Sequence, residues 1–108
     1  MSNKPRIVCL CGSTRFMEAW QKANIDETLA GRIVLSVGCN TKSDADLQRL
    51  GALTDETKAK LDELHLRKID LADEILVLNV GGYIGNSTRN EIAYATKTGK
   101  PIRYLEAK

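Results

Sequence analysis

Two segments of the chain combine glycine, hydroxyl and arginine side chains, which are the residue types that receive a phosphate group. The first segment, Gly12-Ser13-Thr14-Arg15, directly follows an apolar run. Backbone N–H groups at a helix start, together with hydroxyls and a guanidinium, favour the binding of an anion. A second interpretation stays open, in which Ser13 or Thr14 only caps the helix and Arg15 lies in solvent. Neither a Walker motif nor a complete dinucleotide fingerprint occurs, so NTP hydrolysis and ordinary dinucleotide binding lose their usual support.

The second segment, GGYIGNSTRNE, begins as a glycine-rich loop and leads into a predicted helix. Gly82 and Gly85 permit the close approach of a ligand, while the Ser87 hydroxyl and the Arg89 guanidinium can meet an anion. The ring of Tyr83 either stacks on a base or covers an apolar edge. This loop is therefore a second candidate binding segment.

Glu91 lies in the first turn of that helix, near the same crevice. The Thr88-x-x-Glu91 spacing is also that of a capping box, in which the glutamate reaches back to a backbone N–H and needs no substrate. The residues alone leave both interpretations open.

His65 is the only histidine, and its spacing from the apolar residues of its helix places it near the inward face. It points either at the sheet or at the cleft, and acts either as a packed residue or in the chemistry. Trp20 lies near an apolar helix face, so we expect it in the core.

We expect neither a cofactor nor a metal site. Cys9, Cys11 and Cys39 are an odd number without the spacing of a disulfide framework, which predicts reduced thiols in a cytoplasmic protein. We expect the side chains of Cys9 and Cys11 to point to different faces of a strand, and a single histidine makes a four-ligand site hard to assemble.

The elements that must position these residues alternate as β-α-β-α-β-α-β. The predicted strands span 6–11, 33–37, 74–80 and 101–105, and the predicted helices span 14–29, 54–71 and 87–98. This alternation predicts an α/β fold: a Rossmann-like three-layer αβα domain with a four-stranded, mainly parallel sheet. Ligands of such sheets bind outside the carboxyl ends of the strands, so we expect the long segment 38–53 to form one wall of the site.

The length and composition predict one domain, residues 1–108, with a real core. Its 108 residues are 43% hydrophobic and 28% charged, and the net charge is only +2. Scattered basic residues give no footprint for a nucleic acid polymer or an anionic membrane. No secretion signal or membrane-spanning run is visible, which again favours the cytoplasm.

The motifs together resemble those of the nucleoside 2-deoxyribosyltransferase superfamily, and are most similar to its 2′-deoxynucleoside 5′-phosphate N-hydrolase branch. The resemblance lies in CGSTR at 11–15, IDLAD at 69–73 and the segment 85–91, and it spans most of the chain. It implies hydrolysis or transfer at the N-glycosidic bond of a nucleoside or nucleoside 5′-monophosphate. It also implies a homodimer or a larger homo-oligomer.

The resemblance assigns roles by matched position. Glu91 matches the catalytic glutamate that attacks C1′ of the sugar, and Gly12, Ser13 and Arg15 match the loop that holds the 5′-phosphate. Ser87 falls near a second phosphate-contacting serine. The glycosyl-enzyme ester that forms is then resolved by water or a second base with net retention.

The chain departs from the family pattern at two catalytic positions. The family aspartate on the helix before the third strand falls at His65, and the family tyrosine in the first strand falls at Cys9. Asp70 and Asp73 are alternative acids close by, although Asp73 also fits a turn or cap.

Two other functions stay open. One is a non-catalytic nucleotide-binding or nucleotide-sensing module, which would keep the anion loops and lose turnover through the departures at His65 and Cys9. The other is phosphoribohydrolase chemistry, because the glycine-rich loop before Glu91 loosely resembles the P-G-G-x-G-T-x-x-E loop of the cytokinin-activating phosphoribohydrolases.

Overall fold

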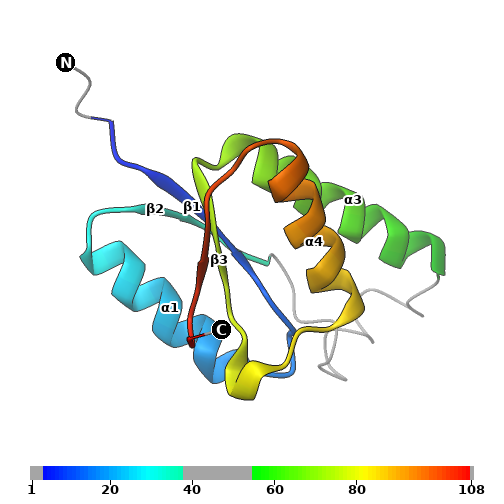
Figure 1. Ribbon diagram of the computed structural model, residues 1–108, viewed down its shortest axis with the longest axis horizontal. Coiled ribbons are helices and arrows are strands. Elements are labelled where there is room, and N and C mark those ends of the chain that lie inside the picture. Colours follow the sequence, from blue (N-terminus) through cyan, green and yellow to red (C-terminus); the bar gives the residue numbers. More distant parts are fainter. Residues whose placement is uncertain (1–3, 38–54, 108) are drawn as a thin grey trace.

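The computed structural model describes residues 4–37 and 55–107, which form one sheet with helices on both faces (Figure 1). The strands pair in the order β2-β1-β3-β4, and every neighbouring pair is parallel. The predicted Rossmann-like α/β fold is confirmed, and the described sheet is wholly parallel. The wall expected from residues 38–53 lies outside the described residues.

The elements follow the predicted order. The strands are β1 (Ile7–Cys11), β2 (Ile33–Leu35), β3 (Glu74–Val77) and β4 (Ile102–Tyr104), and the helices are α1 (Met17–Leu29), α3 (Asp55–Leu71) and α4 (Asn86–Lys97). The expected start of α1 at Thr14 and the expected extension of β3 to Val80 were wrong. A turn occupies the residues before α1, and a short 3-10 helix, η1 (Val80–Gly82), follows β3. Both differences lengthen the loops at the carboxyl ends of the central strands.

Alternate side chains of β1 enter two separate cores, as the period of a strand requires. Leu10 packs with Trp20 beneath α1, whereas Cys9 and Cys11 pack with Ile69 beneath α3 and α4. Trp20 is 1% exposed, so its expected place in the core is confirmed. Because β1 is a central strand with both faces covered, its run IVCLC is apolar throughout.

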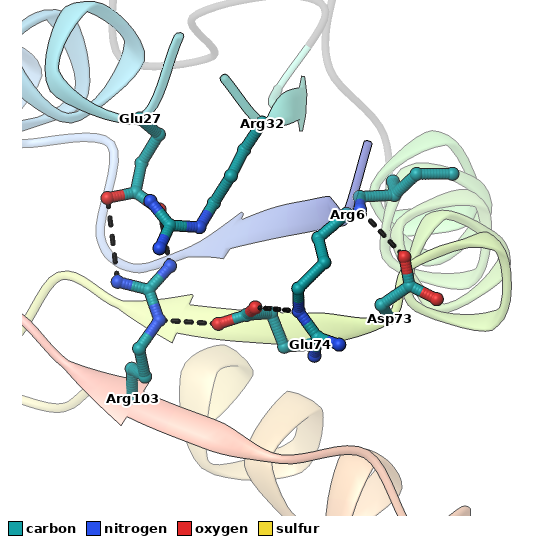
Figure 2. Close-up of polar contacts among 7 residues, drawn as sticks. Arg6, Glu27, Arg32, Asp73, Glu74 and Arg103 are labelled. Carbon is teal, nitrogen blue, oxygen red and sulfur yellow. Dashed lines mark hydrogen bonds and ion pairs between the residues drawn. The ribbon is translucent and has the colours of Figure 1, made fainter. Parts of the chain in front are cut away.

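A chain of ion pairs ties the α1 face of the sheet together (Figure 2). Glu74 at the start of β3 accepts hydrogen bonds from Arg6 at 2.7 Å and from Arg103 of β4. Arg103 also donates to Glu27 of α1, which lies 3.6 Å from Arg32. Glu74 and Glu27 are nearly buried, and guanidinium groups provide the partners that such carboxylates need. Within the described ranges, no helix is long and apolar enough to cross a membrane.

Candidate functional site

A cavity of about 440 Å³ opens beside the loops that follow β1 and β3, against α3 and the start of α4. These neighbouring strands are the point where the strand order reverses, which is where parallel sheets bind ligands. The cavity is lined by Gly12, Ser13, Thr14, Arg15, Trp20, Val37, Lys58, Leu61, Asp62, Leu64, His65, Lys68, Tyr83, Gly85, Asn86, Ser87, Thr88 and Glu91.

A carboxylate and an imidazole line the inner part of the cavity, and two thiols lie behind them in contact with the imidazole. The Nε2–H of His65 donates to the carbonyl of Leu10 at 3.0 Å. The same nitrogen lies 3.6 Å from Sγ of Cys9 and 3.7 Å from Sγ of Cys11. Glu91 interacts with the Cys11 thiol and with the charge of His65. Three elements, β1, α3 and α4, therefore bring these groups to one place.

The expectation that Cys9 and Cys11 face opposite sides of the strand was wrong. Side chains two residues apart on a strand point to the same face, and both thiols belong to the core beneath α3 and α4. Both are wholly buried and reduced, and His65 is 7% exposed. Cys9 and His65 are thus in direct contact.

Burial and mutual contact shift the pKa of each group in this cluster. Burial raises the pKa of the Glu91 carboxyl to about 7, although the adjacent His65 opposes the rise. Burial lowers the pKa of His65, but the Cys9 thiol and Glu91 raise it more, so the imidazole pKa lies above its ordinary value.

The pKa values of the two thiols are shifted in opposite directions. The hydrogen bond with Cys11, together with the adjacent His65, lowers the pKa of Cys9 to about 6 against the effect of burial. The same bond and burial raise the pKa of Cys11 well above its ordinary value. Groups whose pKa values are shifted in this way often cluster at functional sites, so these four residues are the candidates for chemistry at this cavity.

The structure excludes the capping interpretations of both segments. The N-cap of α1 is Phe16, which makes no side-chain cap bond, and Ser13 Oγ instead accepts the N–H of Arg15 at 3.3 Å. The N-cap of α4 is Gly85, so Thr88 is an interior residue of the helix and is buried. The capping-box interpretation of Glu91 was wrong, because its partner does not stand at the helix start.

Tyr83 forms a bridge between the two predicted binding segments. The guanidinium carbon of Arg15 lies 4.7 Å from the centre of its ring, and the ring of Phe16 packs edge-on at 5.9 Å. Arg15 is exposed, but this cation–π contact holds it at the cavity mouth. A Cβ at Gly85 would come within 3.2 Å of the Tyr83 hydroxyl, so the absence of a side chain there accommodates the ring.

Gly12 permits a close approach between β1 and β3. A Cβ at this position would lie 3.0 Å from Cβ of Leu78 and 3.3 Å from its carbonyl oxygen. The first loop therefore passes close to Leu78, just after the end of β3, and its four residues line the cavity.

Three predicted site residues do not line the cavity. Gly82 belongs to η1, and Arg89 is an exposed residue of α4. Asp70 accepts a hydrogen bond from the Tyr94 hydroxyl at 2.5 Å and pairs with Arg67 at 3.2 Å. Its carboxylate is engaged on the outside of the α3–α4 pair.

Two further predicted residues lie behind the cavity or below it. Cys9 does not line the cavity, but its thiol contacts His65, which does. Asp73 accepts the backbone N–H of Ile7 at 2.8 Å, which ties the turn before β3 to the start of β1 (Figure 2). This bond supports the structural interpretation of Asp73.

Sequence reasoning missed a polar stripe on α3. Lys58, Asp62 and Lys68 line the cavity together with His65, and Lys68 donates to the carbonyl of Ser36 at 2.6 Å. The spacing of these residues in the sequence indicates the stripe, because positions three or four residues apart share a helix face. Applying that spacing to His65 would have found the stripe.

Comparisons with known proteins give no further identification. No family model matches the chain, and neither a curated protein nor a solved structure matches it significantly.

Proposed function

We propose that this chain hydrolyses or transfers the N-glycosidic bond of a nucleoside or nucleoside 5′-monophosphate. The observation that carries the proposal is the placement of Glu91 beside His65 in one cavity with the Gly12–Arg15 loop. Glu91 and the Gly12–Arg15 loop are positions at which the sequence resembles the nucleoside 2-deoxyribosyltransferase superfamily, whereas His65 departs from its pattern. The absence of a capping role leaves the Glu91 side chain available for chemistry.

In the proposed mechanism, a carboxylate oxygen of Glu91 attacks C1′ and forms a glycosyl ester while the C1′–N bond to the base breaks. The electron pair of that bond leaves with the base, and His65 donates the proton that the base nitrogen needs. Water or a second base then attacks C1′ from the opposite side and gives its proton to the deprotonated His65, while the ester bond breaks and releases the Glu91 carboxylate. Two inversions give net retention.

The outer part of the cavity suits the phosphate. Ser13 contributes a hydroxyl and Arg15 a guanidinium to the lining of the cavity, and both groups can donate hydrogen bonds to a phosphate. Tyr83 holds the Arg15 side chain against its ring at the cavity mouth, so the cation is partly ordered before a ligand arrives. The class of ligand is a small nucleoside or nucleotide.

The test is chromatographic detection of free base after incubation with each nucleoside and each ribo- and deoxyribonucleoside 5′-monophosphate. We expect release of base from at least one compound, and a loss of at least about a thousandfold in kcat for Glu91→Gln. Glu63→Gln is the matched control, because Glu63 is an exposed carboxylate of α3 that pairs with Arg67 outside the cavity. Release of base that persists in Glu91→Gln would overturn the mechanism.

A second candidate is a nucleotide-sensing module on the same fold. The observation that favours it is the replacement of the family aspartate and tyrosine by His65 and Cys9, which contact each other. A sensor predicts saturable nucleotide binding in calorimetry, little change of affinity in Glu91→Gln, and no free base from any compound.

We also propose that the chain forms a homodimer or a larger homo-oligomer through the helices beside the cavity. Two leucines of α3 support this assembly, because Leu64 and Leu71 are 53% and 68% exposed.

A further inference from the structure

The two thiols and the imidazole behind Glu91 form a triangle of potential metal ligands. The ligand atoms of Cys9, Cys11 and His65 all lie within 4.8 Å of one another. The Nε2 atom of His65 is 3.6 Å from one sulfur and 3.7 Å from the other. All three residues are buried.

Two of these separations, those from Nε2 of His65 to each sulfur, match the spacing in a tetrahedral zinc site. Zinc binds cysteine sulfur at about 2.3 Å and histidine nitrogen at about 2.0 Å, so a tetrahedral angle places the two ligands about 3.6 Å apart. Both nitrogen–sulfur distances in the triangle agree with this spacing. The donor set of two thiolates and one imidazole is also the set that favours zinc over magnesium or calcium.

The backbone holds the triangle in place. Cys9 and Cys11 are paired on β1, a central strand bonded to β2 on one side and β3 on the other. His65 belongs to α3, whose next turn buries Ile69 in the same core. The ligands are therefore positioned by the fold before an ion arrives, which lowers the cost of ordering them.

The triangle meets the cavity at His65. His65 and Glu91 both line the cavity, and Glu91 interacts with the Cys11 thiol. An ion can enter through the cavity, and either a Glu91 oxygen or water can complete a tetrahedron.

We propose that Cys9, Cys11 and His65 bind one thiophilic metal ion, with zinc as the ion that fits the triangle. Binding forms two zinc–sulfur bonds and one zinc–nitrogen bond, and both thiol protons leave to solvent. The Nε2 proton also departs, so the hydrogen bond from His65 to the Leu10 carbonyl breaks and the neutral ring carries its proton on Nδ1. This proposal reverses our sequence-based expectation of no metal, which rested partly on placing the two thiols on different faces.

The test is titration of the reduced, metal-free protein with Co²⁺ and then Zn²⁺. We expect one equivalent of Co²⁺ to produce a thiolate charge-transfer band and the visible bands of a tetrahedral site, and Zn²⁺ to displace it. In Cys9→Ser and Cys11→Ser we expect the affinity for Zn²⁺ to fall at least about tenfold. Cys39→Ser is the matched control, because it removes the third thiol and leaves the triangle intact.

Two results would overturn the proposal: Co²⁺ binding without a thiolate band, or equal Zn²⁺ affinity in the wild type and the Cys9→Ser, Cys11→Ser double variant. X-ray absorption of the zinc-loaded wild type gives a readout that does not depend on variants folding. We expect two sulfur ligands at about 2.3 Å, and a shell of nitrogen and oxygen alone would contradict the site. Because every readout is binding, failure of the glycosidase proposal would leave this test unaffected.

Discussion

Three contacts at Nε2 hold the imidazole ring of His65 in one orientation. The Leu10 carbonyl and the two thiols all lie beside Nε2, while the residue also lines the cavity next to Glu91. A side chain fixed in this way can present a proton to a ligand without first being ordered.

If His65 protonates the departing base, its loss should depend on the leaving group. We expect His65→Ala to reduce kcat by between about a hundredfold and ten-thousandfold with an ordinary nucleotide. A 7-methylguanine nucleotide should be far less affected, because its cationic base leaves as a neutral molecule without added protons. Steady-state rates of base release measure both. Glu91→Gln is the control, since the cationic base should not rescue it, and an equal loss for both substrates in His65→Ala would contradict the role.

Arg15 provides the test of the phosphate site. We expect Arg15→Ala to weaken nucleotide binding by about tenfold to a hundredfold, because a charge-assisted hydrogen bond is lost, and to leave nucleoside binding nearly unchanged. Calorimetry with matched nucleoside and nucleotide pairs measures the difference. Arg89→Ala is the control, because Arg89 is exposed and does not line the cavity. Equal weakening of both ligands in Arg15→Ala would place the phosphate elsewhere.

Gly12 is a packing requirement of the first loop. We expect Gly12→Ala to lower the free energy of unfolding by about 1–3 kcal/mol, since the new methyl group would press on Leu78 at the end of β3. Gly85→Ala should cost less, because its methyl group would meet only the tip of the exposed Tyr83 ring, which can move. Urea denaturation measures the free energy of unfolding of both variants. A larger loss for Gly85→Ala than for Gly12→Ala would contradict this ranking.

At the scale of elements, the ion pairs around Glu74 link β3 to β4 and, through Arg103, to α1 (Figure 2). Burial raises the pKa of the Glu74 carboxyl, but hydrogen bonds from Arg6 and Arg103 outweigh it and hold the pKa below its usual 4.5. A carboxyl whose pKa is lower in the folded state stabilises the protein above its unfolded pKa. That contribution is lost as the pH falls through the folded value.

We therefore expect Glu74→Gln to lower the free energy of unfolding by about 1–3 kcal/mol at neutral pH, and by much less in acid. Denaturant titrations at neutral pH and well below pH 4.5, the ordinary pKa of the group, measure both differences. The control is Asp26→Asn, which removes an exposed pair with Lys22 within α1 and should change little at either pH. A deficit in Glu74→Gln that stays constant as the pH falls would refute the linkage.

The elements themselves follow from patterns in the sequence, but their ends do not. The apolar run of β1 and the glycine after α1 place those elements closely. Val80 was assigned to a strand because it continues an apolar run, whereas Gly81 adopts a positive φ within η1 and turns the chain. The start of α4 differs by one residue from its predicted position, whereas the capping box would need Thr88 in place of the N-cap Gly85, three residues earlier.

At the scale of the whole molecule, the proposed assembly is testable from mass alone. We expect light scattering of the purified protein to give a mass of at least two chains of 11.9 kDa. Leu71→Glu on α3 should shift the mass towards a single chain, because it places a charge at the expected contact. Leu29→Glu is the control, since Leu29 is more exposed but lies on α1 across the sheet. A wild-type mass of one chain would contradict the assembly.

The sequence by itself determined the order of strands and helices, the parallel sheet and the segments that meet at its carboxyl edge. It could do so because the period of apolar residues identifies each element, and because parallel connections allow few arrangements. Only the tertiary structure decided which side chains share the cavity. Cys9 and His65 are 56 residues apart in the chain, and their contact depends on how α3 packs across β1. Local periodicity predicts which face of an element is buried, but not how two elements are aligned against each other. The sequence therefore did not show that Asp70 bonds to Tyr94 outside the cavity while His65 contacts the two thiols.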